Sequence, residues 1–287
     1  MGAPGVETVT SPWAAHHRRA QTLRDRHPFA GEVLTLYLAL LDVWAQAFQA
    51  TRQEPPAPEA LAGWAAGRVL PRVVAATVEA GPEPLAAAAG AFMDERAAEE
   101  PLAAWLAGAE LEPVERYLAR ASLRAPLQAL GGAAAAYGED AAPRGGRRCP
   151  SCGGPPQLSF RGDTHDQLVS GRRLLVCARC GTSWNYSASA CASCGESGGA
   201  RRTIFAERRD GIVVGHGKLT APVEAGGPVF PHLRIEACDT CKRYLIDVDL
   251  GHDARAVPEV DELAALPLDL YAAERGLTKI TPNLMGF

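Results

Sequence analysis

Residues 177–195 read CARCGTSWNYSASACASCG, and this stretch holds two of the four Cys-x-x-Cys pairs that decide how the chain folds. Every cysteine of the chain belongs to such a pair. The pairs are Cys149/Cys152, Cys177/Cys180, Cys191/Cys194 and Cys238/Cys241. Two thiolates three residues apart on a tight turn face the same side, so two such turns can surround one tetrahedral ion. The pattern therefore predicts two metal sites with four cysteines each.

The residues that follow the pairs refine this prediction. Gly153, Gly181 and Gly195 directly follow three of them. Glycine tolerates the positive φ that turns backbone N–H groups toward the sulfurs, as in rubredoxin and zinc-ribbon knuckles. Lys242 follows the fourth pair, so that turn has to form without glycine.

Four knuckles can share two ions in three ways. Consecutive pairing leaves 24 and 43 residues between the knuckles of each site. An interleaved arrangement would bring the first and third pairs together, although only ten residues separate the second pair from the third. We favour consecutive pairing because shorter loops lose less entropy on closure. The ion is left open between iron and zinc, since four sulfurs suit both.

The complete set of four sulfur ligands also indicates whether such a site can catalyse a reaction. Four cysteines leave no position on the ion for water or substrate, so the sites are predicted to be structural or electron-transferring. We therefore expect that the chain is not an enzyme.

Length and composition indicate a chain that can bury a core, with 287 residues, 47% of them hydrophobic and 22% charged. The first thirty residues have no apolar stretch of the secretory kind, and Arg18 and Arg19 are expected on a solvated helix face. The longest apolar run, Val33 to Leu41, is too short to span a bilayer. We expect no membrane insertion and a cytoplasmic location, where metal thiolates outlast disulfides.

The N-terminal half has the spacing of helices. Apolar residues recur three and four apart from 33 to 48, and Pro55 ends that segment. Alanine-rich, proline-punctuated segments over 83–99, 102–111, 113–123 and 126–137 predict further short helices. Residues 1–140 are therefore predicted to form an all-α domain, in which large aromatic side chains supply much of the packing.

A polar linker is predicted at 141–148, and the pattern then changes to short strands. These are expected over 157–161, 173–176, 183–186, 203–208, 212–214 and 244–250, with helices over 259–266 and 268–275. The predicted fold class is α+β. The helical domain is followed by two small rubredoxin-like or zinc-ribbon β modules, at 149–190 and 191–287, and the second carries a short C-terminal helical tail.

Charge is uneven in this half. Residues 144–210 contain eleven arginines and five acidic residues, although the whole chain has a net charge of −4. We do not favour nucleic-acid binding by an arginine patch, because the negative charges of the tetrathiolate sites and of the whole chain would weaken it. The segment is predicted to be an arginine-rich surface of the β modules.

The sequence around the knuckles resembles the FdhE family, the formate dehydrogenase accessory or formation proteins. The resemblance rests on Cys149-Pro-Ser-Cys-Gly153, on 175–184 (LVCARCGTSW), on Cys191-Ala-Ser-Cys-Gly195 and above all on 234–245 (RIEACDTCKRYL). It is specific over about 149–285 and weaker over the helical half.

The resemblance implies a cytoplasmic maturation chaperone for the catalytic subunit of a respiratory molybdenum or tungsten formate dehydrogenase, bound before export. It implies two rubredoxin-like metal centres, and a partner contact at Asp239, Thr240, Lys242 and Arg243, which flank thiolates and are too polar to bury unpaired. A redox or oxygen-sensing metalloprotein is the alternative, and a nucleic-acid-binding zinc ribbon is less favoured. The oligomeric state is left open.

Overall fold

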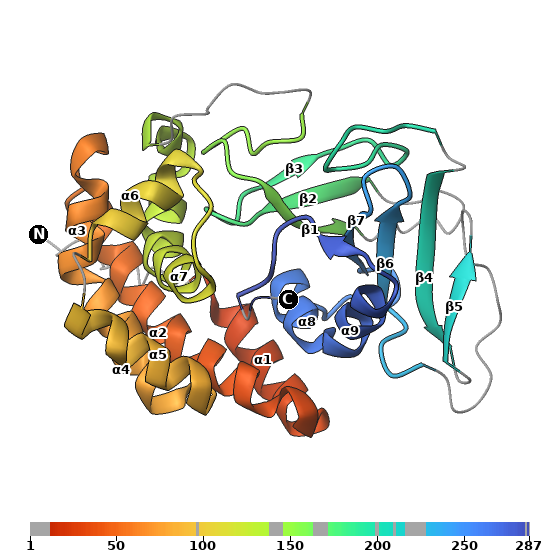
Figure 1. Ribbon diagram of the computed structural model, residues 1–287, viewed down its shortest axis with the longest axis horizontal. Coiled ribbons are helices and arrows are strands. Elements are labelled where there is room, and N and C mark those ends of the chain that lie inside the picture. Colours follow the sequence, from red (N-terminus) through yellow and green to blue (C-terminus); the bar gives the residue numbers. More distant parts are fainter. Residues whose placement is uncertain are drawn as a thin grey trace, which may run out of the picture.

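The structure is a computed structural model that describes residues 12–95, 98–137, 146–162, 172–198, 201–208, 211–215, 228–284 and 286. Figure 1 shows helices α1 to α7 on one side of the molecule and a sheet on the other, with α8 and α9 lying beside the sheet. This arrangement confirms the predicted α+β class. Most of the predicted linker lies outside the described residues, since residues 138–145 are not among them.

The helical half is built around α7, which is buried from Tyr117 through Leu127. Its helices are α1 (Ala14–Arg26), α2 (Gly31–Gln53), α3 (Leu61–Arg68), α4 (Leu70–Ala80), α5 (Glu83–Glu95), α6 (Glu100–Ala107) and α7 (Pro113–Leu130). Short 3-10 turns occupy Pro28–Ala30, Pro58–Ala60 and Gly131–Tyr137. Aromatic side chains do fill the spaces between these alanine-rich helices, because Trp44, Trp105 and Tyr117 are all buried.

The expectation of two helices over 113–123 and 126–137 is wrong, because α7 continues through Pro126. Proline cannot donate to the carbonyl of Ser122, one turn earlier. Packing outweighs this loss, since the residues on both sides of Pro126 are buried against α2 and its neighbours. The indole Nε1 of Trp44 on α2 also donates to the carbonyl of Ala121, at 2.7 Å.

Within the described residues, one helix is long and apolar enough to cross a membrane. This segment covers Pro28–Gln53, with a mean hydropathy of 1.3, and 44% of its most apolar window is buried in the structure. Core helices meet the same criterion, and α2 packs against α1, α4 and α7. The segment is therefore accounted for as a core helix of the N-terminal half.

The strands of both cysteine modules belong to one sheet. In the part of the chain that is described they are β1 (Pro156–Arg161), β2 (Arg173–Cys177), β3 (Ser183–Asn185), β4 (Arg202–Arg208), β5 (Gly211–Gly215), β6 (Leu233–Cys238), β7 (Arg243–Asp249) and β8 (Thr278–Lys279). Their order is β3-β2-β1-β7-β6-β4-β5, with β8 also paired to β7. The parallel pairing of β1 with β7 joins the two modules. The proposed division at residues 190 and 191 stays a prediction.

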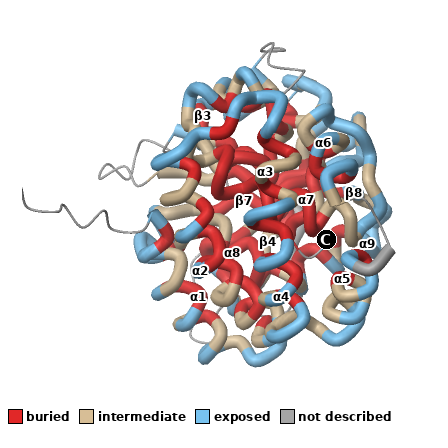
Figure 2. Tube along the Cα trace, turned by 90° about the vertical axis from the view of Figure 1, so that its left-hand side faces the viewer, coloured by how far each residue is buried: buried red, intermediate tan, exposed pale blue. Residues whose placement is uncertain are grey.

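Helix α8 (Pro258–Ala264) connects the sheet to the helical half, and α9 (Leu266–Glu274) packs against β6 and β8. Helix α8 contacts β1 and β7 on one side and α1 and α2 on the other. In Figure 2 the buried residues gather in the middle of the molecule, around β7, α7 and α8. The core is therefore continuous from the helices to the sheet.

The expectation that Arg18 and Arg19 share a solvated face is half wrong. Arg18 is exposed, but Arg19 is buried and bonds Asp261 on α8 with its Nε and Nη2, at 2.5–3.1 Å. Its Nη2 also reaches Asp253, at 2.8 Å. A buried guanidinium needs such carboxylates, so this contact fixes α1 against the C-terminal segment.

Candidate metal centres

The first cluster brings together four buried cysteines, Cys149, Cys152, Cys177 and Cys180, from the two turns that flank β1 and β2. The Sγ atoms of Cys149 and Cys180 are 3.6 Å apart, and those of Cys152 and Cys177 are 3.4 Å apart. A tetrahedral ion with metal–sulfur bonds of ~2.3 Å requires sulfurs about 3.8 Å apart. This set of donors fits zinc or iron, and its composition confirms consecutive pairing of the knuckles.

Local backbone geometry explains why these turns present both sulfurs. Gly153 and Gly181 have φ of 69° and 70°, and each donates its N–H back to the carbonyl of the first cysteine of its pair. That closure leaves the N–H of Ser151 aimed at Cys149 Sγ, at 3.4 Å, and the N–H of Arg179 aimed at Cys177 Sγ, at 3.3 Å. Such bonds favour thiolates, the form that binds metals.

Four buried sulfurs cannot all carry charge without a cation between them. Burial, followed by the neighbouring sulfurs, raises the pKa of the Cys177 thiol well above its usual range. A divalent ion would supply the missing positive charge and cross-link the two turns. The chemistry of the donor set therefore fits a bound metal.

Helix α7 reaches this first cluster through Arg124. The guanidinium Nη1 donates to the carbonyl of Cys177, at 3.3 Å, and Nη2 bonds Glu259 on α8, at 2.5 Å. A side chain at Gly181 would collide with this guanidinium. The knuckle glycine thus lets the helical half approach the cluster directly.

The second cluster consists of Cys191, Cys194, Cys238 and Cys241, and it lies nearer the surface. The sulfurs of Cys191 and Cys241 are 3.8 Å apart, and those of Cys194 and Cys238 are 3.7 Å apart. Cys194 is exposed and Cys241 is half-buried, whereas the other two are buried. Burial raises the pKa of Cys241 to about 12, although a backbone N–H bond opposes this.

The knuckle without glycine has the same backbone shape as the others. Lys242 has a φ of 56°, and its N–H donates to the carbonyl of Cys238, at 2.9 Å. Among the described residues it is the one non-glycine residue with positive φ. Such a residue is held in place by its surroundings at a conformational cost.

The four residues predicted to contact a partner surround the second cluster, and all four are exposed. Asp239 accepts a hydrogen bond from Thr203, and Thr240 donates to Glu196, at 3.0 and 3.2 Å. Arg243 donates to the carbonyl of Ile280, at 3.4 Å. The structure therefore gathers them on one surface, and their contact with a partner stays a prediction.

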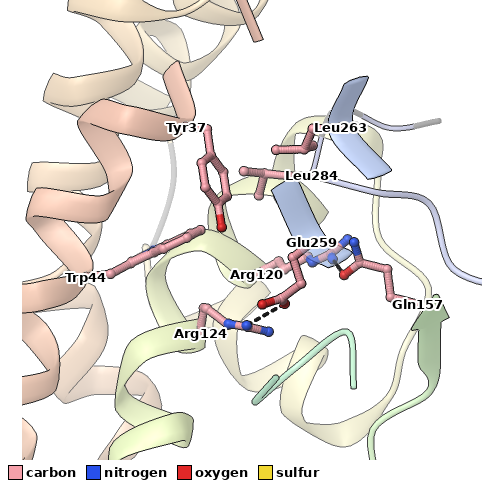
Figure 3. Close-up of a pocket in the computed structure, with 8 residues that line it drawn as sticks. All are labelled: Tyr37, Trp44, Arg120, Arg124, Gln157, Glu259, Leu263 and Leu284. Carbon is pink, nitrogen blue, oxygen red and sulfur yellow. Dashed lines mark hydrogen bonds and ion pairs between the residues drawn. The ribbon is translucent and has the colours of Figure 1, made fainter. Parts of the chain in front are cut away.

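A small cavity of about 30 Å³ lies between the helical half and the sheet. Figure 3 shows Tyr37 and Trp44 facing Arg120, Arg124 and Glu259 across it. The volume suits one or two water molecules. Its polar side chains hold the two halves together, since Arg120 donates to Gln157 and to the carbonyl of Pro282.

The predicted arginine-rich surface is wrong for three arginines that lie in the strands. Arg161, Arg173 and Arg202 converge on the buried carboxylate of Glu236, at 2.5–2.7 Å. Asp247, which is also buried, binds Arg161 and Arg234 at 3.1 and 2.6 Å. These arginines neutralise carboxylates inside the sheet and are not free to bind a nucleic acid.

This network shifts the pKa of its central carboxylate. Burial alone would raise the pKa of Asp247, but the charges of Arg234 and Arg161 more than offset it, so the pKa lies below its usual value. Asp247 is therefore ionised in the folded protein.

The buried ionic residues and His16 are not among the candidate residues predicted from the sequence. His16 is half-buried, and its Nδ1 lies 2.8 Å from the hydroxyl of Tyr37. Arg120 and Arg124 carried a usable signal, because they recur four apart within an apolar helix and so had to face a polar partner. Nothing local marks Glu236, whose partners lie on β1, β2 and β4, whereas Asp247 faces Arg234 on the preceding strand.

A helical half joined to one sheet with two four-cysteine clusters defines a class of protein with paired rubredoxin-like or zinc-ribbon sites. The model of the FdhE C-terminal domain matches residues 224–285. This match covers less than a quarter of the chain, so it shows similarity to FdhE proteins over the C-terminal segment.

The chain is 31% identical over 139 residues to the FdhE homolog of Aquifex aeolicus, an alignment covering 48% of this chain and 41% of that protein. It is 31% identical over 137 residues to the FdhE homolog of Pseudomonas aeruginosa, covering 48% and 38%. The chain thus spans about two fifths of the length of the curated relatives that it matches. The crystal structure of the FdhE protein from Pseudomonas aeruginosa has the same fold, with a TM-score of 0.60 and 22% identity over 95% of this chain and 94% of that one.

Proposed function

We propose that this chain is a non-catalytic, cytoplasmic maturation factor for the catalytic subunit of a respiratory molybdenum or tungsten formate dehydrogenase. It binds that subunit before export, while the cofactors are inserted. Similarity to FdhE proteins over the C-terminal half supports an accessory role in formate dehydrogenase formation. The observation that carries the proposal is the second cysteine cluster, which lies at the surface within a rim of exposed polar residues.

We propose the eight cysteines as metal ligands, four to each of two ions, iron or zinc. Both clusters have sulfur spacings that suit a tetrahedral ion. Their donor sets are complete without solvent, which supports a structural or recognition role over hydrolysis. Anaerobic purification followed by iron and zinc analysis and a visible spectrum tests this assignment.

The partner contact is proposed at Asp239, Thr240, Lys242 and Arg243. Each is exposed beside the second cluster, where a bound ion would hold the turn rigid. A tagged catalytic subunit should capture this chain, and Lys242→Glu/Arg243→Glu should abolish capture without changing the metal content. Arg52→Glu, on α2 in the helical half, is the control. Equal capture of all three chains would refute the contact.

A redox or oxygen-sensing role is the second candidate, and the exposure of Cys194 favours it. Such a role requires iron in the second cluster and a reversible change of the visible spectrum in air. Colourless protein with two zinc ions would leave only the maturation role.

A further inference from the structure

A groove runs between α1 and the residues that precede α8. Its volume is about 500 Å³, within the range of pockets that bind ligands. Four arginines line it, Arg18, Arg19 and Arg26 from α1 and Arg255 from the other wall. The remaining lining is alanine, threonine and valine, so small side chains form a floor between positive rims.

Two of the rim charges, those of Arg18 and Arg26, face no counter-charge in the groove. No acidic residue lines it, and within the described residues no ion pair involves Arg18 or Arg26. Arg255 is 80% exposed and lies 3.7 Å from Asp253. The pKa of the neighbouring His27 is lowered, first by burial and then by the positive charges of Arg26 and Arg19.

The groove is held open by a rigid base. Arg19 bonds Asp253 and Asp261 and so ties α1 to the opposite wall, and His232 supports Asp261 from 2.7 Å. Positions 18, 22 and 26 recur every four residues, so they lie along one face of α1. A ligand would therefore meet arginines whose backbone positions are fixed along α1 and against the opposite wall.

We propose that this groove binds an acidic segment of a partner protein. Carboxylates of the segment pair with Arg18, Arg26 and Arg255, and its aliphatic side chains cover the small-residue floor. The proposal rests on the proposed function and extends it, because it gives the partner subunit a second contact on α1. A duplex nucleic acid fits less well, since the chain as a whole carries a net charge of −4 and would repel an extended polyanion.

A labelled peptide of alternating Glu, Leu and Asp, titrated with the full chain in fluorescence anisotropy, tests the groove alone. Its glutamine and asparagine counterpart is the uncharged control. We expect Arg18→Glu/Arg26→Glu to weaken binding of the acidic peptide by at least ~10-fold. Arg24→Glu makes the same charge change on the same helix outside the groove, and it should cost no more than about threefold. Equal losses for both variants would overturn the proposal.

Two further measurements separate this proposal from the proposed function. If a DNA duplex of matched charge binds as tightly as the peptide, the groove is a general polyanion site and the proposal falls. Capture by the tagged formate dehydrogenase subunit should also decrease in Arg18→Glu/Arg26→Glu. Undiminished capture would refute the groove as a partner contact while leaving the proposed function intact. Peptide binding by the groove with no capture of wild-type protein would refute the proposed function alone.

Discussion

At the residue scale, the knuckles show how one backbone position governs each metal site. Glycine occupies it at 153, 181 and 195 and lysine at 242, yet all four have a positive φ. The shape is required because it turns backbone N–H groups toward the sulfurs. A side chain at this position therefore adds conformational strain, which should be measurable.

Replacing Lys242 with glycine should stabilise the protein. Glycine removes the strain of a left-handed side chain, which is worth ~1 kcal/mol after the entropy of the unfolded chain is subtracted. Urea unfolding of the metal-bound protein measures the change. Arg243→Gly, one residue on and without a positive φ, is the control and should lose stability.

Alanine at two equivalent knuckle glycines should have unequal effects. Gly195→Ala adds only the strain of a positive φ, since the nearest atom to the new Cβ is 3.7 Å away, on Arg147. Gly181→Ala adds the same strain and also displaces the buried guanidinium of Arg124. We expect a loss of ~1 kcal/mol for the former and at least ~2 kcal/mol more for the latter. Equal losses in thermal unfolding would show that Arg124 moves away freely.

The cysteines could be predicted from the sequence because their information is local. Spacing and following glycines indicate both the turn and the grouping of the pairs. Arg19 and Arg124 were not predictable in the same way, since their roles depend on Asp261 and Glu259, more than a hundred residues further along the chain.

At the scale of elements, strand β6 was missed and α7 was divided for the same reason. Arg234 and Glu236 make β6 look like a polar loop, but their charges are met by neighbouring strands. Pro126 suggests a helix end, but burial on both sides keeps α7 continuous. Helix α2 was predicted correctly because its apolar spacing is uninterrupted. Contacts with other elements therefore determine β6 and the length of α7, which the local sequence pattern predicts wrongly.

Replacing Asp247 with asparagine should destabilise the sheet by about 3 kcal/mol, because Arg161 and Arg234 then face a neutral amide. The depressed pKa means that Asp247 contributes stability above its unfolded pKa of ~4, and that this is lost as pH falls through the lower folded value. Denaturation midpoints between pH 7 and pH 3 should therefore fall less steeply in Asp247→Asn than in the wild type. Asp42→Asn, at an exposed site on α2, should follow the wild type.

At the scale of the whole molecule, the two clusters differ in their access to solvent. The four sulfurs of the first are buried beneath Arg124 and α7, whereas the second exposes Cys194. Chelators reach an ion only where solvent can. The clusters should therefore lose their metals at different rates.

Treatment with a chelator should release about half of the metal in a fast phase, because the second cluster supplies one of the two proposed ions. Alkylation during this phase, read by mass spectrometry, should modify Cys194 and Cys241 before Cys177 and Cys180. A single phase with simultaneous alkylation of both clusters would contradict the difference in access.

The pairing of β1 with β7 also determines when the sheet can form as the chain is synthesised. Ser159 forms a hydrogen bond with Asp247, which lies 88 residues further along the chain. Arg19 forms its ion pair with Asp261, which lies 242 residues further along. A ribosome releases the N-terminal helices and the first two knuckles well before these partners exist. Until residues 243–261 emerge, β1 presents an unpaired edge, which can join other chains. A nascent chain that stalls before that point cannot close its sheet, and it differs from the finished protein by that open strand.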